Sequence, residues 1–355
     1  MTIRIKARMA MAMTALAFSG LAHASTAYTL QWLPGLTSPL GSAQGINNAG
    51  QVVGYSYTPS FELQAAVWND GTATALDSLG GTFGRARAVN NAGQVIGDLG
   101  SRATIWNNGV ATVLDTLGGN FSTARGINDA GQVVGAIDSR AAIWNNGTAT
   151  DLGTLGGSFS AAVAISPAGQ VVGASSISGD TASRATAWIN GKAIDLGTLG
   201  GGSSSAAAVN NVGQVVGGSN IAGDAGWHAT MWHNGTATDL GTLGGTLSYA
   251  NGINNAGQVV GYSLAADGNG YATIWINGTA IDLNSFLSAA QRADGASLLE
   301  AHAINDAGQV VGYGLNNGVQ TAFLLSPVPE PQTYALMLLG LGAMAFVRRQ
   351  RQAKV

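Results

Sequence analysis

Four aspartates recur at equivalent positions, each followed by leucine: Asp151, Asp195, Asp239 and Asp282. If the fold gathered them at one end, a ring of carboxylates could bind cations or a glycan. The alternative is that each carboxylate accepts hydrogen bonds from nearby backbone amides, as aspartate commonly does where a strand ends. No local pair of carboxylates has the arrangement that a glycosidase needs. The sequence therefore favours the local role, and these residues are weak binding candidates.

The other chemically active residue types are sparse. The chain has four histidines and no cysteine, which excludes thiol catalysis and cysteine-bound zinc. His228 and His233 are five residues apart, so on a strand they would point to opposite faces and could not share a metal. Calcium loops, phosphate loops, metalloprotease motifs and serine-hydrolase motifs are absent from the sequence. We therefore expect no catalytic, metal-binding or cofactor-binding residue, and no enzyme activity.

An internal repeat supplies the elements that would position these residues. The sequence Gly-Gln-Val/Ile occurs seven times, at intervals of 38 to 51 residues. Most copies follow a turn such as Asn47-Asn48-Ala49-Gly50, and because Asn and Gly tolerate positive φ, this pattern predicts a tight hairpin. The seven glutamines are Gln51, Gln94, Gln132, Gln170, Gln214, Gln258 and Gln309.

Each repeat contains four short runs that favour β-strands. In the third copy these runs are Ala124–Asn128, Gln132–Ile137, Arg140–Asn145 and Thr148–Leu155, and the last ends at Gly156-Gly157. Four strands in about 40 residues is the pattern of a β-propeller blade. Six third strands carry a tryptophan that we expect to pack between blades: Trp68, Trp106, Trp144, Trp188, Trp232 and Trp275.

The number of strands predicts how the ring closes. Six fourth strands are expected to end at Leu79, Leu117, Leu155, Leu199, Leu243 and Phe286. The seventh repeat lacks a fourth strand, and the N-terminus offers a spare run at Tyr28–Leu36. Pairing of this run beside Gln320–Leu325 would close an all-β, seven-bladed propeller of four-stranded blades and remove a free edge. An open solenoid is the alternative, but it would need polar capping repeats.

The repeats resemble the HAF family of bacterial extracellular repeats over about residues 28–325. The matching features are the Asn-Asn/Asp-Ala-Gly-Gln-Val-Val-Gly hairpin, the Ala-Thr-x-Trp strand and the segment Asp151–Gly157. The histidine that opens the family's namesake strand remains only at His228, which argues against a shared metal or catalytic role. The last repeat has an insertion up to Glu300 that we expect to hold a short helix. The resemblance implies export and repetition without a defined activity.

The N-terminus has the three parts of a secretory signal peptide. Three cations precede an apolar run from Met9 to Leu21, and Ala22-His23-Ala24 supplies small residues for the peptidase. We expect signal peptidase to cleave after Ala24 and remove residues 1–24, so that the mature chain begins at Ser25. A buried N-terminal helix is the alternative.

The C-terminal segment, residues 327–355, reads as a membrane-anchoring tail. Val328-Pro329-Glu330-Pro331 precedes an apolar stretch from Thr333 to Val347, and Arg348 and Arg349 follow. The stretch is short for a spanning helix, and the cations would hold its end in the cytoplasm. The segment resembles the PEP-CTERM sorting signal of Gram-negative bacteria. That resemblance implies anchoring in the inner membrane, processing by an exosortase near the motif, and a host that makes extracellular polysaccharide.

The charge between the two ends excludes one class of partner. The chain has 15 Lys and Arg, of which seven lie in the two terminal segments, whereas 17 of its 18 acids lie between residues 25 and 329. The exported part is therefore acidic and would repel a phosphate backbone, so we expect no nucleic acid. The sequence predicts an exported surface or matrix protein whose propeller, residues 25–326, binds polysaccharide or other polymers. A propeller glycan hydrolase or lyase with acidic residues at the axis is the alternative.

Overall fold

The structure is a computed structural model that describes residues 27–328. These residues hold 28 β-strands, two 3-10 helices and one short α-helix, and they form one compact unit from Tyr28 to Val328. Within this part of the chain, no helix is long and apolar enough to cross a membrane. The predicted signal peptide, its cleavage site and the predicted tail helix lie outside the described residues. The described chain is therefore an all-β domain.

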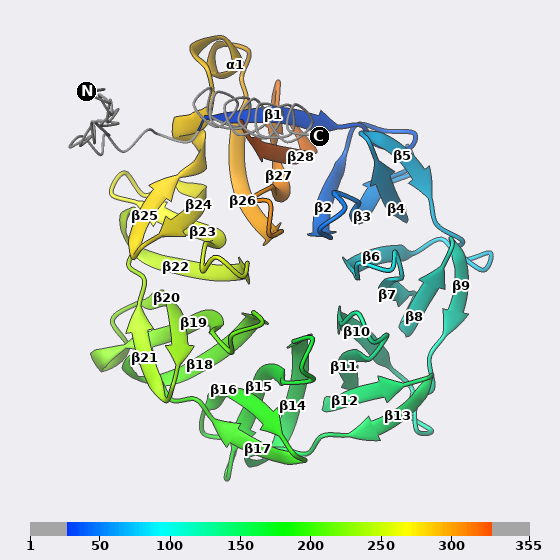
Figure 1. The fold of residues 1–355 in the computed structure, drawn as a ribbon, viewed down its shortest axis with the longest axis vertical. Helices are drawn as coiled ribbons and strands as arrows, with labels where there is room; N and C mark the ends of the chain where they lie inside the picture. The colour runs from blue at the N-terminus through cyan, green and yellow to red at the C-terminus, as the bar shows by residue number, and fades with distance from the viewer. Residues whose placement is uncertain (1–26, 329–355) are drawn as a thin grey trace, which may run out of the picture. The chain divides into compact units, whose positions relative to one another are not determined.

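The strands pair in antiparallel groups of four that follow the sequence repeat. The first strands, nearest the axis in Figure 1, are β2 (Gly41–Ile46), β6 (Gly84–Val89), β10 (Ser122–Ile127), β14 (Gly156–Ile165), β18 (Gly200–Val209), β22 (Gly244–Ile253) and β26 (Ser297–Ile304). The second strands are β3 (Val52–Tyr57), β7 (Val95–Leu99), β11 (Val133–Ile137), β15 (Val171–Ile177), β19 (Val215–Ile221), β23 (Val259–Ala265) and β27 (Val310–Asn316). The third strands are β4 (Leu63–Asn69), β8 (Arg102–Asn107), β12 (Arg140–Asn145), β16 (Ser183–Ile189), β20 (Trp227–His233), β24 (Gly270–Ile276) and β28 (Val319–Pro327). The outermost strands are β5 (Thr72–Ala75), β9 (Val110–Val113), β13 (Thr148–Asp151), β17 (Lys192–Asp195), β21 (Thr236–Asp239), β25 (Thr279–Asp282) and β1 (Tyr28–Leu33).

The groups follow one another around a central axis (Figure 1). Hydrogen bonding in the described chain gives five separate four-stranded sheets and one eight-stranded sheet. The larger sheet joins the groups β18 to β21 and β22 to β25 through one parallel bridge between Trp227 and Leu247. The first strands of successive groups contact each other, and β2 also contacts β26. The last group therefore lies beside the first.

The N-terminal strand completes the last sheet. Strand β1 pairs with β28 from Tyr28 opposite Pro327 to Leu33 opposite Ala322, so the predicted pairing is confirmed. Leu33 is buried with Val52 and Ala322, in a cluster that joins the first and last groups. This strand stabilises the fold by covering an edge of β28 that would otherwise be free to pair.

The repeated tryptophans pack between neighbouring groups, as predicted. Their exposed fractions are 3% or less. Trp144, for example, packs with Ile96 and Leu114 of the preceding group, and its Nε1 donates to the Asp115 backbone oxygen at 2.7 Å. These side chains therefore fill the space between sheets and offer no exposed platform.

The fourth strands are shorter than predicted. Strand β13 ends at Asp151, and not at Leu155, because Gly153 adopts a φ of 78° that a strand does not allow. Leu155 instead forms a parallel bridge with Ile177, and Gly156-Gly157 begins β14. The prediction was wrong in all six copies, whose fourth strands end at Ala75, Val113, Asp151, Asp195, Asp239 and Asp282.

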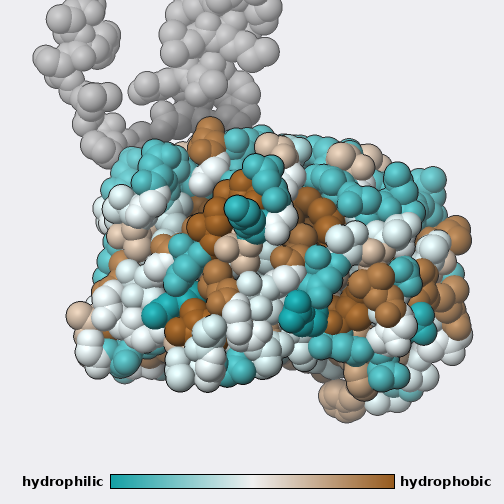
Figure 2. All heavy atoms as spheres, turned by 90° about the horizontal axis from the view of Figure 1, so that it is seen from below, coloured by the Kyte–Doolittle hydropathy of each residue, from teal (hydrophilic) through white to brown (hydrophobic). Residues whose placement is uncertain are grey.

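The helices lie in connections. The insertion in the last repeat holds the 3-10 helix η2 (Leu283–Phe286) and the helix α1 (Ala289–Ala293), so the predicted short helix is confirmed. A capping box formed by Ser288 and Gln291 begins α1. The other 3-10 helix, η1 (Ala222–Asp224), connects β19 and β20. Figure 2 shows one side of the outer surface, where apolar side chains are interspersed with polar ones.

Candidate functional site

The four candidate aspartates lie at the ends of four separate outer strands. Each carboxylate accepts a hydrogen bond from the backbone two residues further on, at 2.7 to 2.8 Å. Three of them also pair with the first or second residue of the adjacent third strand, in the pairs Arg140–Asp151, Arg184–Asp195 and His228–Asp239. The structure therefore places these residues where the local role predicts, and it does not bring them together at the axis.

These pairs give the variable opening position of the third strand a structural role that sequence reasoning missed. Arg140 and Asp151 lie 3.0 Å apart, and His228 Nδ1 and Asp239 lie 2.8 Å apart. Both aspartates are more than 40% exposed, so each pair contributes at most about 1 kcal/mol. In these three repeats, arginine or histidine at this position pairs with the outer strand.

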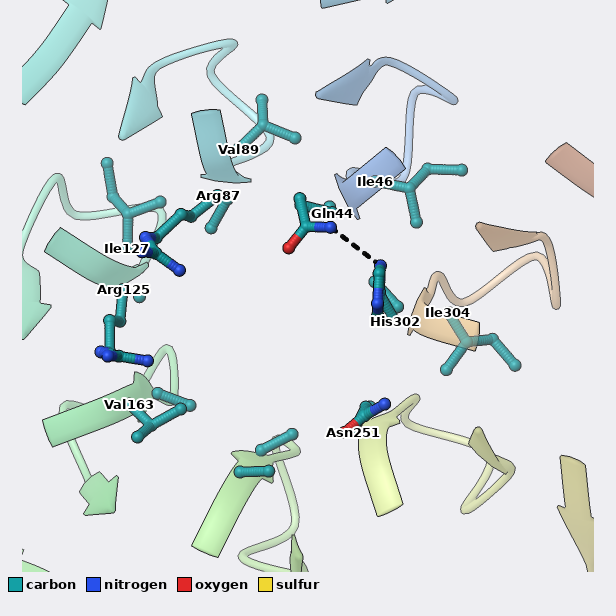
Figure 3. A pocket seen from close by; sticks show the side chains of 18 of the residues that line it. Gln44, Ile46, Arg87, Val89, Arg125, Ile127, Val163, Asn251, His302 and Ile304 are labelled. Atoms are coloured by element: carbon teal, nitrogen blue, oxygen red, sulfur yellow. Dashed lines mark hydrogen bonds between the residues drawn. The ribbon is translucent and has the colours of Figure 1, made fainter. Parts of the chain in front are cut away.

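The first strands present one side chain each to a cavity of about 410 Å³ on the axis (Figure 3). Each of these residues is skipped by the pairing register between the first and second strands, which marks a β-bulge. Bulges re-aim side chains and occur often beside functional sites. We call these residues the axial ring: Gln44, Arg87, Arg125, Val163, Ala207, Asn251 and His302.

The axial ring has unequal sides. Figure 3 shows Arg87 and Arg125 on one side of the cavity, with Gln44, His302 and Asn251 on the other. The two small apolar members, Val163 and Ala207, come from the consecutive first strands β14 and β18. A ligand in the cavity would therefore meet cations, neutral hydrogen-bonding groups and an apolar wall.

Arg87 is fixed by a buried carboxylate. Its Nε donates to Asp98 Oδ2 at 2.7 Å, and the Asp98 side chain is 6% exposed. Asp98 Oδ1 also accepts from the Ala124 backbone amide at 3.3 Å, which ties β7 to β10. Because both carboxylate oxygens are occupied, Asp98 positions Arg87 and is not itself presented to a ligand.

Arg125 is the cation left free to bind. Within residues 27–328 its guanidinium forms no ion pair and no hydrogen bond, and its side chain is accessible to water in the cavity. The surrounding walls and the positive charge of Arg87 lower the pKa of Arg125 from its ordinary value, although Asp98 acts in the other direction. An anion beside Arg125 would relieve this repulsion.

The opposite side of the axial ring is held by hydrogen bonds. His302 Nδ1 lies 2.7 Å from the Ala43 carbonyl oxygen, which can only accept, so Nδ1 carries a proton. Gln44 Nε2 lies 3.0 Å from the same nitrogen, and because both nitrogens then carry hydrogens this contact is not a hydrogen bond. Gln44 Nε2 instead donates to Ser42 Oγ at 2.8 Å. Burial acts to raise the pKa of Glu300. A hydrogen bond and positive charge from His302 act to lower it, with smaller contributions from hydrogen bonds to Asn251 and Tyr313. The lowering effects together exceed the effect of burial, so the pKa of Glu300 is lowered.

The other end of the axis is lined by the hairpin turns. An apolar collar lies next to the axial ring, and beyond it a cavity of about 180 Å³ is lined by Asn and Asp. Six asparagine amides there donate to a backbone oxygen of the next group; Asn47 Nδ2, for example, donates to Asn90 O at 3.0 Å, and Asn305 Nδ2 donates to Asn47 O at 3.0 Å. The collar residues are Ile46, Val89, Ile127, Ile165, Val209, Ile253 and Ile304. The sequence predicted the turns but gave no signal for these cross-links.

Exposed aromatic side chains lie near the starts of four first strands, at the open end. Phe83 and Phe121 directly precede β6 and β10, Phe159 lies in β14, and they are 38%, 63% and 39% exposed. Tyr249, at 40% exposure, lies in β22 and stacks near Trp227, with ring centroids 5.7 Å apart. Exposed aromatic faces beside a polar cavity suit ligands with both polar and apolar faces, such as sugars.

Known proteins resemble this chain in two ways. Its fold is similar to that of TolB from Acinetobacter baumannii, at 12% identity and a TM-score of 0.42. The match covers 79% of this chain and 64% of TolB, so this chain spans less than two thirds of the length of TolB. It is also similar to the SapL1 lectin in complex with alpha methyl fucoside, at 13% identity and a TM-score of 0.36, covering 83% of this chain and 98% of the lectin. A variant of the Aleuria aurantia lectin in complex with Fucalpha1-6GlcNAc gives 13% identity and a TM-score of 0.37, with 81% and 97% covered. Likeness this distant carries no conclusion about a ligand, and no curated protein matches the chain.

The second resemblance is confined to the C-terminus. Residues 327–352 match the family described as the PEP-CTERM protein-sorting motif. This agrees with the tail predicted from Val328, Pro329, Glu330, Pro331, Arg348 and Arg349. The motif is a substrate signal for exosortase and directs an exported protein to the surface, with its tail in the membrane before processing. The chain therefore carries the sorting signal of an exported surface protein.

Proposed function

We propose that the exported domain is a seven-bladed β-propeller of HAF-type repeats that binds extracellular polysaccharide without cleaving it. The contact of β2 with β26 and the pairing of β1 with β28 support a closed ring. The observation that carries the binding function is the axial ring, in which seven bulged side chains surround an open cavity. Its polar members supply hydrogen bonds for sugar hydroxyls, and the aromatic side chains at its open end supply faces on which sugar rings stack.

The alternative is a glycan hydrolase or lyase that works at the axis. Of the carboxylates in the described chain, Glu300 is the one best placed for it, because it contacts His302 and Asn251 of the axial ring. Glycoside hydrolysis usually needs a second carboxylate across the bond. The nearby Asp98 is buried and bonded to Arg87 and to the backbone, which supports binding over hydrolysis.

A panel of immobilised polysaccharides, including the host's own, tests this function. The full-length protein should be retained by at least one glycan and should release no shorter chains or unsaturated ends. Tyr249→Ala should weaken that binding about 2- to 10-fold, since it removes a stacking face. Ile194→Ala is the matched control, because Ile194 has a similar exposure of 43% on the outer strand β17. Cleavage of the bound glycan would establish the enzyme instead, and loss of binding in both variants would place the site elsewhere.

A further inference from the structure

Part of the positive charge of this acidic domain lies at or near the axis. Eight Lys and Arg remain between residues 25 and 329, against 17 acids. Three of the eight, Arg85, Arg87 and Arg125, lie on two adjacent first strands. Net repulsion elsewhere on the domain would direct an anion to this one basic region.

These three arginines have one carboxylate among them. Asp98 bonds Arg87 at 2.7 Å, and no other ion pair in residues 27–328 involves the three. Arg85 lies over the Tyr55 ring at 5.0 Å, and its buried Nε has no hydrogen-bond partner within the described structure. The group therefore lacks negative charge and hydrogen-bond acceptors.

The free guanidinium of Arg125 faces a cavity with room for a ligand. Arg87 is held beside it by Asp98, so that two forked donors reach the same side of the cavity (Figure 3). Such forks match the two oxygens of a carboxylate. The facing amides of Gln44 and Asn251 are suited to hydroxyl groups, and the Asn251 amide also donates to Glu300 and to the Ala301 backbone oxygen, each at 3.0 Å.

We propose that Arg125 and Arg87 bind the carboxylate of an acidic sugar residue, a uronic acid, within a polysaccharide chain. This inference rests on the proposed polysaccharide binding and names the class of glycan. Arg87 is the anchored half of the clamp, and Arg125 is the half whose charge the ligand neutralises. The aromatic side chains at the open end hold the neighbouring sugars.

The test compares two forms of one glycan that differ only in charge. Titration of the full-length protein with oligogalacturonate, and with its methyl ester, measures the preference for the carboxylate at low salt. The acid should bind about 10- to 100-fold more tightly, the range expected for a charge-assisted hydrogen-bonded pair. Arg125→Gln should reduce binding of the acid to that of the ester and leave the ester unchanged, and Arg125→Lys should give an intermediate affinity because it keeps the charge but loses the fork.

Arg102→Gln is the matched control, because Arg102 is an exposed cation on a third strand, away from the axial ring. It should not change the preference. Equal binding of acid and ester, or a preference that survives Arg125→Gln, would overturn the clamp while leaving polysaccharide binding intact.

If neither oligomer binds, titration with galacturonate alone separates the arginine clamp from the proposed polysaccharide binding. Binding that depends on Arg125 would then support the clamp and contradict the polymer function, and no binding would overturn both. A sulfated oligosaccharide that binds better than the acid would assign the clamp to sulfate esters and overturn the carboxylate assignment.

Discussion

At the scale of single residues, the tryptophans and the hairpin asparagines join neighbouring groups of strands. Trp106 and its equivalents are large apolar residues at a fixed strand position, and they are buried between the groups. The asparagine that begins six of the seven hairpins also favours a turn, so the sequence did not reveal its second role. Asn254, for example, accepts from the backbone of Gln258 and donates to Asn305 O in the next group.

The fourth repeat provides a natural test of these cross-links, because it has Ser166 in place of the asparagine and forms no such bond to Asn210. We expect Ser166→Asn to add the missing bond and raise the free energy of unfolding by about 0.5 to 1.5 kcal/mol. The reciprocal change Asn254→Ser should lower it by about 1 to 3 kcal/mol, because a buried acceptor loses its partner. Denaturant unfolding of both variants checks this, and two changes of the same sign would contradict the cross-link.

Glu300 predicts a pH dependence. Its pKa in the folded protein is lowered, mainly by His302 acting against the effect of burial. A carboxylate with a lowered folded pKa stabilises the fold above its unfolded pKa of about 4.3 and loses that contribution as the pH falls through the folded value. The melting-temperature difference between the native protein and Glu300→Gln should therefore be constant from pH 7 to about pH 5 and shrink at lower pH. A difference that widens on acidification would mean that Glu300 is protonated in the fold.

At the scale of elements, the strand pattern predicted the third strands best and the fourth strands worst. Arg140–Asn145 has the bounds that the sequence predicted, because turns at positive φ fix both of its ends: Asp138-Ser139 before it and Asn146-Gly147 after it. The fourth strands were predicted too long because the segment that follows them, Leu-Gly-Thr-Leu in three of the six copies, still favours a strand by composition. The turn at Asp151 and Gly153 overrides that preference, and the chain passes to the next sheet.

The element with the largest expected effect is β1. Deleting residues 25–36 removes all strand pairing to the outer edge of β28. It also removes the Pro34 backbone oxygen, to which Trp68 Nε1 donates at 2.7 Å. We expect a fall in melting temperature of more than about 10 °C, together with aggregation, since the exposed edge can pair with other chains. Calorimetry and light scattering measure both effects, and a chain that ends at Val328 is the control. Unchanged melting after the deletion would show that β1 does not hold the ring together.

At the scale of the whole molecule, the sequence predicted the fold class and the destination but not the candidate site. Periodic strands and terminal signals are local patterns that one pass along the chain can detect. The axial ring depends on which residue of each first strand is bulged and on which strands are neighbours around the axis. Asp151 and its equivalents were predicted as candidates because they recur at equivalent positions. Arg87, Arg125 and His302 were not, because the residue at their position differs from one repeat to the next.

Export makes a prediction about the whole chain. In a host with an exosortase, the surface form should begin at Ser25 and lack the terminal segment from Arg348 to Val355. Intact-mass measurement of the surface fraction decides both ends, with the same chain expressed without exosortase as the control. A surface form that retains Arg348 and Arg349 would contradict processing and leave a simple membrane anchor.

The central claim is that this exported domain holds a glycan at its axis, and an experimental structure with a bound oligogalacturonate tests it most directly. We expect a sugar carboxylate in contact with Arg125, sugar hydroxyls near Gln44 and Asn251, and a second sugar on the aromatic side chains at the open end. Glycan bound at the outer strands, beside Asp151, Asp195 and Asp239, with the axial cavity empty would contradict the account.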